Sequence, residues 1–172
     1  MHFTRRYLMA GFLAMLMLVP TAAGPLRPGQ KELSNEVRSL GGLDTFKVAI
    51  NVESRLLEDT NFPIDALKAK IEAMLTAAGF KLSDEPATPL VHVTLVTQGN
   101  EDHPALVSLS YHITVRQNVV IPRLEQTVFV PTYTLVHPAL LEKENLRPQF
   151  DRDIKNLTTF LINRVRFATE SL

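Results

Sequence analysis

The sequence predicts an α+β fold: a two-layer sandwich in which a mainly antiparallel sheet of about four to five strands carries two helices on one face, in the order β-α-β-β-β-α. Apolar and polar residues alternate over 46–52, 91–97 and 107–115, which is the period of half-buried strands. Two segments, 63–78 and 148–168, instead carry apolar residues three and four positions apart, as amphipathic helices do. Because the strands are grouped between the helices, most should pair antiparallel.

Residues 1–23 have the composition of a secretory signal peptide. Arg5 and Arg6 precede an uncharged apolar run from Tyr7 to Val19, and small residues follow up to Ala23. The apolar core is shorter than the roughly 20 residues that a membrane-spanning helix needs. We therefore expect the leader to be removed after Ala23 and the protein to be exported, to the periplasm or out of the cell. The segment Thr4–Met9 resembles a twin-arginine signal, although an ordinary Sec-type signal fits as well.

Residues 24–44 are predicted to form a tether with a possible short helix, and residues 45–172 a single α+β domain. The tether opens with prolines and closes with Gly41 and Gly42. Between them Leu33, Val37 and Leu40 recur at helical spacing, but three apolar side chains bury little, so the helix is expected to be loosely docked.

The domain begins with a predicted strand at Thr45, followed by a helix over 63–78. Pro63 suits the first turn of a helix, and Gly79 suits a left-handed residue just beyond its end. Ile64, Leu67, Ile71 and three further apolar residues mark its buried face.

A hairpin and a further strand follow, over 91–97, 107–115 and 126–136. Pro131 cannot donate to a central ladder, which predicts that the last strand lies at an edge or contains a bulge. His137 precedes Pro138 and is expected to mark the end of that strand. The closing helix presents a continuous apolar stripe, made of Phe150, Ile154, Leu157, Leu161, Val165 and Ala168.

The composition excludes several classes of function. The chain contains no cysteine, so it has no disulfides, no thiol chemistry and no lipid-bearing cysteine after its leader. The leader holds two of the 18 basic residues and none of the 18 acidic ones, so the remainder is slightly acidic. This balance predicts no nucleic-acid partner, and no stable membrane span is expected once the leader is gone.

Two histidines are the candidate metal ligands. If the hairpin turn is centred on Asp102, its apolar residues face one another and His92 stands opposite His112. Directly opposed side chains have Cβ atoms about 4.5–5.5 Å apart, close enough to share a transition metal or form a pH-sensitive patch. The alternative is a solvated polar face, because two histidines do not complete a zinc site. The loop tripeptide Glu101-Asp102-His103 has the same two interpretations.

The face of the sheet opposite the helices is predicted to be polar with scattered apolar side chains, suited either to a partner or to solvent. Its expected members are Leu90, His92, Thr94, Val96, Leu106, Ser108, Ser110, His112, Thr114 and Arg116, joined by Phe129, Tyr133 and Leu135.

No catalytic motif is present. The chain lacks a G-x-S-x-G elbow, a phosphate-binding glycine loop and an H-E-x-x-H pair. We therefore assign no catalytic residues and no cofactor, and the sequence favours a non-catalytic protein without excluding an enzyme.

The pattern Val91-His92-Val93-Thr94-Leu95, the strand from Val107 to Val115 with Tyr111 at its middle, and a terminal helix around Ile154 and Leu161 resemble small exported bacterial proteins of unknown function. The element order is also similar to that of the N-terminal domain of TolB and of the lipoprotein LptE. The resemblance implies a non-catalytic envelope protein that binds another envelope protein or component. It implies no functional residues, and its lipid anchor does not carry over because the cysteine is missing.

The sequence thus predicts a non-catalytic exported binding or accessory protein of the bacterial cell envelope, of undetermined oligomeric state. The alternative is a metal-responsive protein or small metal-assisted hydrolase that uses His92 and His112.

Overall fold

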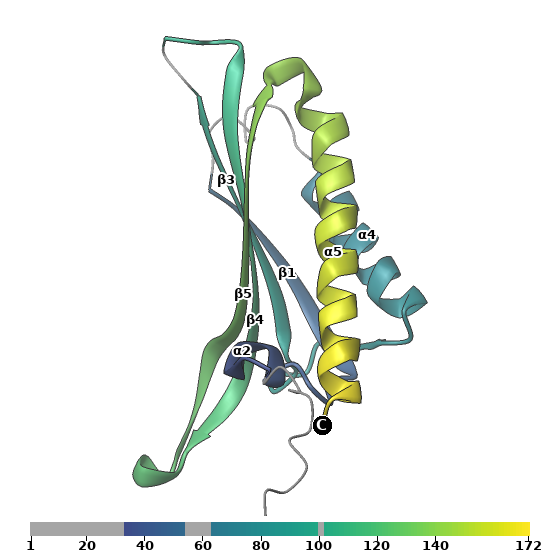
Figure 1. The fold of residues 1–172 in the computed structure, drawn as a ribbon, viewed down its shortest axis with the longest axis vertical. Coiled ribbons are helices and arrows are strands. Elements are labelled where there is room, and N and C mark those ends of the chain that lie inside the picture. The colour runs from purple at the N-terminus through teal and green to yellow at the C-terminus, as the bar shows by residue number, and fades with distance from the viewer. Residues whose placement is uncertain (1–32, 54–62, 100–101) are drawn as a thin grey trace, which may run out of the picture. The chain divides into compact units, whose positions relative to one another are not determined.

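The computed structural model describes residues 33–53, 63–99 and 102–172, and it has the predicted two-layer α+β architecture (Figure 1). The predicted signal peptide and residues 24–32 of the predicted tether lie outside these residues, so the domain boundaries remain predictions. The described strands form one five-stranded sheet in the order β2-β1-β3-β4-β5. Their bounds are Thr45–Glu53 for β1, Lys81–Leu82 for β2, Leu90–Gly99 for β3, Leu106–Ile121 for β4 and Gln126–Glu142 for β5.

The sheet is mixed. β4 runs antiparallel to both β3 and β5, as predicted, but β1 pairs parallel to β3 from Lys47↔Leu90 to Glu53↔Val96 and also parallel to β2. Parallel neighbours need a crossover, and helix α4 (Ile64–Ala77) lies between β1 and β2 in the chain. Figure 1 shows α4 and α5 on the same side of the sheet.

Helix α4 begins and ends where its sequence predicts. Pro63 occupies the N-cap, and Leu67, Ile71 and Leu75 are buried. Gly79 has a φ of 94°, which glycine adopts without a Cβ penalty. Its N–H donates to the Thr76 carbonyl and the N–H of Phe80 donates to the Leu75 carbonyl, which together form a Schellman cap.

Helix α5 spans Leu146–Glu170 and begins two residues earlier than predicted. All six residues of the predicted stripe are buried, with exposed fractions of 8% or less. They pack with Phe46, with Leu75 and with the buried apolar residues of β3 and β4 in one continuous core. At about 1.5–3 kcal/mol for each fully buried large side chain, this stripe stabilises the contact between α5 and the sheet substantially.

The segment before β1 is firmly attached, where loose docking was expected. Helix α2 (Asn35–Arg38) is capped by Ser34, and Leu40 behind it is completely buried. The Ser39 hydroxyl donates to the Thr132 carbonyl at 3.2 Å, and the Gly42 N–H donates to Thr169 Oγ1 at 3.0 Å. These bonds join the segment to β5 and α5, so its few apolar residues are supplemented by polar contacts.

Strand β5 is an edge strand and contains a bulge, as Pro131 predicts. Val115 pairs with Tyr133 and Arg116 pairs with Pro131, which leaves Thr132 as the extra residue. The expectation that the strand ends at His137 is wrong: β5 continues through Pro138 to Glu142. An edge strand accommodates proline where its nitrogen faces away from the neighbouring strand.

Beyond the bulge, β4 and β5 continue as a two-stranded hairpin. The pairing of β3 with β4 ends at Leu90↔Arg116, whereas β4 and β5 stay paired to Ile121↔Gln126. A single 3₁₀ turn, Pro122–Leu124, joins them. We call residues 117–130 the arm; in Figure 1 it is the hairpin at the lower left.

Candidate functional site

The face of the sheet away from α4 and α5 has no helix over it among the described residues (Figure 1). Because side chains alternate along each strand, the even-numbered residues of β3 and β4 lie on this side, while their odd-numbered neighbours are buried against the helices. We call this surface the open face. Its central residues are His92, Thr94, Val96, Ser110, His112 and Thr114, with Thr134, Val136, Pro138 and Leu140 contributed by β5.

The predicted opposition of His92 and His112 is wrong. In the observed register His92 pairs with Thr114, and His112 pairs with Thr94. The predicted parity is correct, but the register is shifted by two residues, so the hairpin is centred on His103 and not on Asp102. The two histidines are now diagonal neighbours on one face, whose Cβ atoms are typically about 7–8 Å apart.

Among the described residues, the surroundings of the two histidines offer no third metal ligand. His112 Nε2 lies 3.0 Å from the Ser110 hydroxyl. Within residues 33–53, 63–99 and 102–172, no three His, Asp or Glu side chains gather in a way that could hold a metal ion. Of the loop tripeptide, Glu101 lies outside the described residues, and Asp102 and His103 are exposed. Metal binding by His92 and His112 stays a prediction.

The apolar part of the open face lies on β5. Val136 and Leu140 have exposed fractions of 50% and 71%, and both lie on the same face of the strand. Pro138 lies between them and is also exposed. The open face therefore combines a polar centre with an apolar margin at the sheet edge.

Three aromatic and aliphatic residues were expected to join this face, and the bulge divides them. Phe129 lies on it, because the Arg116 guanidinium stacks 5.1 Å from the Phe129 ring. Tyr133 is only 6% exposed and Leu135 packs against the core, so both face the helices. The extra residue at Thr132 reverses the alternation between Pro131 and Tyr133.

The free edge of β5 is protected against strand pairing. Lys143 donates its N–H to the Ala105 carbonyl at 2.9 Å, and bonded pairs recur every second residue along an antiparallel ladder. Pro138 thus falls at a position whose backbone nitrogen faces away from β4. It has no N–H to offer a further strand, and the bulge and the Ser39 bond to Thr132 alter the edge farther along. Prolines and bulges are common protections of edge strands.

A buried polar pair inside the core was not predicted from the sequence. Tyr111 is completely buried, and Asp153 on α5 is 5% exposed. Asp153 Oδ1 accepts a hydrogen bond from Gln149 Nε2 at 2.8 Å, whereas neither its Oδ2 nor the Tyr111 hydroxyl has a partner of normal geometry among the described residues. The two groups are nevertheless close: burial raises the pKa of the Tyr111 hydroxyl, and the Asp153 carboxylate raises it further.

His137 lies beside this pair, with its ring 5.9 Å from that of Tyr111. A tyrosine, a carboxylate and a histidine are all groups that can move protons. However, Tyr111 is inaccessible to solvent, so no substrate reaches its hydroxyl in this structure. We interpret the cluster as a structural element under α5.

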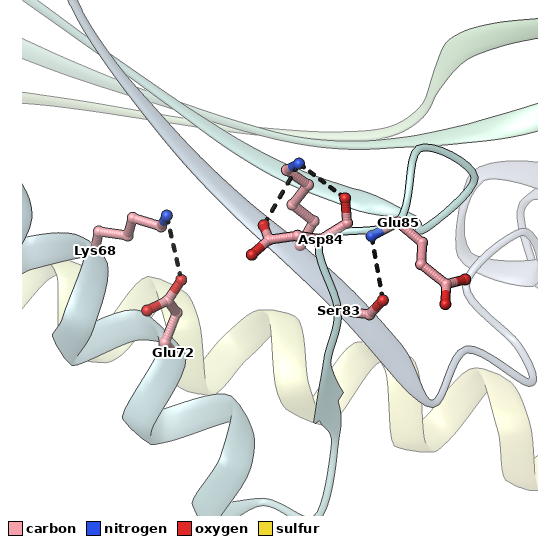
Figure 2. A network of polar contacts seen from close by, with 6 residues as sticks. Lys68, Glu72, Ser83, Asp84 and Glu85 are labelled. Atoms are coloured by element: carbon pink, nitrogen blue, oxygen red, sulfur yellow. Dashed lines mark hydrogen bonds and ion pairs between the residues drawn. The ribbon is translucent and has the colours of Figure 1, made fainter.

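An ion pair links β1 to the segment after β2, and a further pair lies on α4 (Figure 2). Lys47 Nζ lies 3.4 Å from Asp84 Oδ1 and also donates to the Asp84 carbonyl oxygen. On α4, Lys68 and Glu72 form a pair one turn apart at 3.6 Å. Asp84 is 90% exposed, and exposed pairs of this kind contribute little to stability, about 0–1 kcal/mol. The network is therefore a surface feature, and the adjoining hollow of about 150 Å³ is small.

A shallow cavity of about 270 Å³ lies where α4 and α5 begin, and it is smaller than a typical ligand pocket of roughly 300–1,000 Å³. Its lining includes two cationic side chains, Lys70 and Arg147, and Lys70 binds Asp151 with 2.7 Å between Nζ and Oδ1. We assign no ligand to it. In the described part of the chain, no helix is both long enough and apolar enough to cross a membrane.

Comparison with known proteins gives a distant structural likeness. No protein-family model matches the chain, and no curated protein matches it. The crystal structure of a minor lipoprotein from Acinetobacter baumannii is similar over 76% of this chain and 90% of that chain, with 15% sequence identity and a TM-score of 0.34. A likeness at this level does not extend that protein's name or role to this chain.

Proposed function

We propose that this chain is a non-catalytic accessory protein of the bacterial envelope, which is exported and binds another envelope component through its open face. The observation that carries the proposal is the pairing of an uncovered sheet face with two strongly exposed aliphatic side chains, Val136 and Leu140. With the exposed Pro138 between them, they form an apolar row on one face of β5, and contiguous apolar patches can mark binding sites.

The export part of the proposal rests on the leader. The apolar run after Arg5 and Arg6 is typical of signal peptides, and a body without cysteine needs no oxidative folding after export. Fractionation of the native host, followed by mass spectrometry of the N-terminus, tests it directly. We expect an envelope or secreted protein that begins near Gly24, whereas a cytosolic protein that retains Met1 would contradict export.

The binding part is tested by capture from envelope extracts of the native host. We compare the wild-type protein with a Val136→Ser/Leu140→Ser variant, because both side chains are exposed and their replacement should leave the core intact. A Val120→Ser/Leu124→Ser variant is the matched control, since these residues are of the same types and have exposed fractions of 64% and 50%. We expect one specific component to be lost with the open-face variant alone.

Two results would oppose this proposal. One is a folded wild-type protein that repeatedly captures nothing. The other is a component that is captured equally well by the wild type and the open-face variant.

A further inference from the structure

The arm, residues 117–130, is the second exposed apolar surface of the molecule. It has no third strand among the described residues, because β3 ends its pairing with β4 at Arg116. An isolated two-stranded hairpin is only marginally stable in water, and it usually needs another surface to pack against.

Apolar side chains occupy both faces of the arm and its turn. Val119 and Val120 are 37% and 64% exposed, and as consecutive strand residues they point to opposite faces. Leu124, in the turn, is 50% exposed. The apolar surface therefore surrounds the end of the hairpin instead of lying on one side of it.

This distribution favours one kind of partner. A flat protein surface would cover one face of the hairpin and leave the other in water. A lipid surface surrounds an inserted hairpin end on all sides, so that Val119, Val120 and Leu124 would all leave water together.

The arm carries one cation and one anion, so its formal net charge is zero. Arg123 and Glu125 in the turn are its only charged residues. A long arginine side chain can bury its stem and keep its guanidinium among the headgroup phosphates. Nearer the base, Arg116 stacks on Phe129 and supplies a second cation.

We propose that the arm inserts its end into the boundary between the headgroups and acyl chains of a lipid bilayer. The inference goes beyond the proposed function, because the arm and the Val136–Leu140 margin are separate parts of β4 and β5. Either surface can therefore fail its test without affecting the other.

The absence of tryptophan from the chain allows a local test. A Leu124→Trp variant is purified with the N-terminus that the expressing host leaves on it. It is then mixed with vesicles of phosphatidylethanolamine and phosphatidylglycerol. We expect its emission to shift to shorter wavelength as the indole leaves water. A Leu140→Trp variant with the same N-terminus is the control, and its emission should not change.

Vesicle flotation supplies a second measurement that needs no added aromatic residue. The Val120→Ser/Leu124→Ser variant should lose roughly tenfold or more of its vesicle binding, since two aliphatic side chains no longer enter the apolar layer. The Val136→Ser/Leu140→Ser variant should float as the wild type does. Any retained leader contributes equally to all variants, and circular dichroism confirms that each is folded.

Three results would overturn the inference. The first is an unchanged Leu124→Trp emission at saturating vesicle concentration. The second is equal flotation of the arm variant and the wild type. The third is capture of a specific envelope protein that depends on Val120 and Leu124 while vesicles do not bind, which would assign the arm to a protein partner.

Discussion

The Tyr111 hydroxyl and the Asp153 carboxylate lie close together in the core beneath α5, without a hydrogen bond of normal geometry between them. Burial of a charge is costly unless it is well paired. Among the described residues, the Asp153 carboxylate accepts one hydrogen bond of normal geometry, from the Gln149 amide. The pair therefore makes the contact between α5 and the sheet sensitive to the ionisation of Tyr111.

Alkaline pH should destabilise the protein through Tyr111. Its pKa is raised in the folded state, first by burial and then by Asp153, so the folded protein keeps a proton that the unfolded chain releases above a pH of about 10. The resulting stability is complete below that pH and is lost as the pH rises further, by up to about 1.4 kcal/mol per pH unit. Urea unfolding between pH 8 and 11.5 measures this slope.

A Tyr111→Phe variant should lose most of that slope, because phenylalanine has no proton to release. A Tyr133→Phe variant is the comparison: burial also raises the pKa of Tyr133, although Arg164 opposes the rise, so this variant should lose a smaller part of the slope. An equal alkaline slope in the wild type and in Tyr111→Phe would show that Tyr111 does not control alkaline unfolding.

Substitution of Gly79 should weaken the end of α4. Its φ of 94° costs a residue with a Cβ about 1–2 kcal/mol, and no atom lies near enough to clash with that Cβ. Gly79→Ala should therefore lower the free energy of unfolding by this amount. Gly79→Asn should lose less, because asparagine tolerates positive φ better. Equal stability of Gly79→Ala and the wild type would refute the cap.

Replacement of Pro138 should allow the edge of β5 to pair with a strand of another molecule. Valine restores an N–H that faces away from β4 and adds an aliphatic side chain between Val136 and Leu140. We expect Pro138→Val to form dimers or larger assemblies at concentrations where the wild type does not, as measured by light scattering. Pro138→Lys restores the same N–H but adds a charge that discourages pairing, so it should behave as the wild type.

Metal binding at His92 and His112 can be decided by elemental analysis of protein purified without a histidine tag. The diagonal register predicts weak binding at most, because two imidazoles without a third ligand leave a zinc or copper ion largely hydrated. Stoichiometric metal that disappears in a His92→Ala/His112→Ala variant would restore the metal-dependent alternative. Metal-free wild-type protein would remove it.

Much of the fold could be predicted because its elements carry strong local signals. The apolar stripe from Phe150 to Ala168 specified α5, and Gly79 specified the end of α4. The alternation around Val93 and Ile113 gave the correct faces of β3 and β4, and Pro131 predicted an edge or a bulge, of which β5 has both. Each of these features follows from the conformations open to a single residue or a single turn.

The remaining features depend on contacts that no short segment encodes. The parallel pairing of β1 with β3 is a non-local choice. The register of the β3–β4 hairpin differs by two residues from the predicted one, and this shift separates the two candidate metal ligands. The burial of Asp153 could not be predicted from the sequence, because a carboxylate next to an apolar stripe normally lies in solvent.

The parallel placement of β1 beside β3 has a consequence for how the chain assembles. Strands β3, β4 and β5 follow one another both in the chain and in the sheet, so their pairings are local in sequence. The pairing of β1 with β3 instead spans the crossover that contains α4, and because local contacts form faster, we expect β1 to join the sheet last. Until β1 pairs, the edge of β3 that faces away from β4 is unpaired, and β3 contains no proline that would discourage pairing with another strand. We therefore expect the protein to be most prone to aggregation before β1 pairs with β3, because a strand of a neighbouring chain can then pair with the same edge.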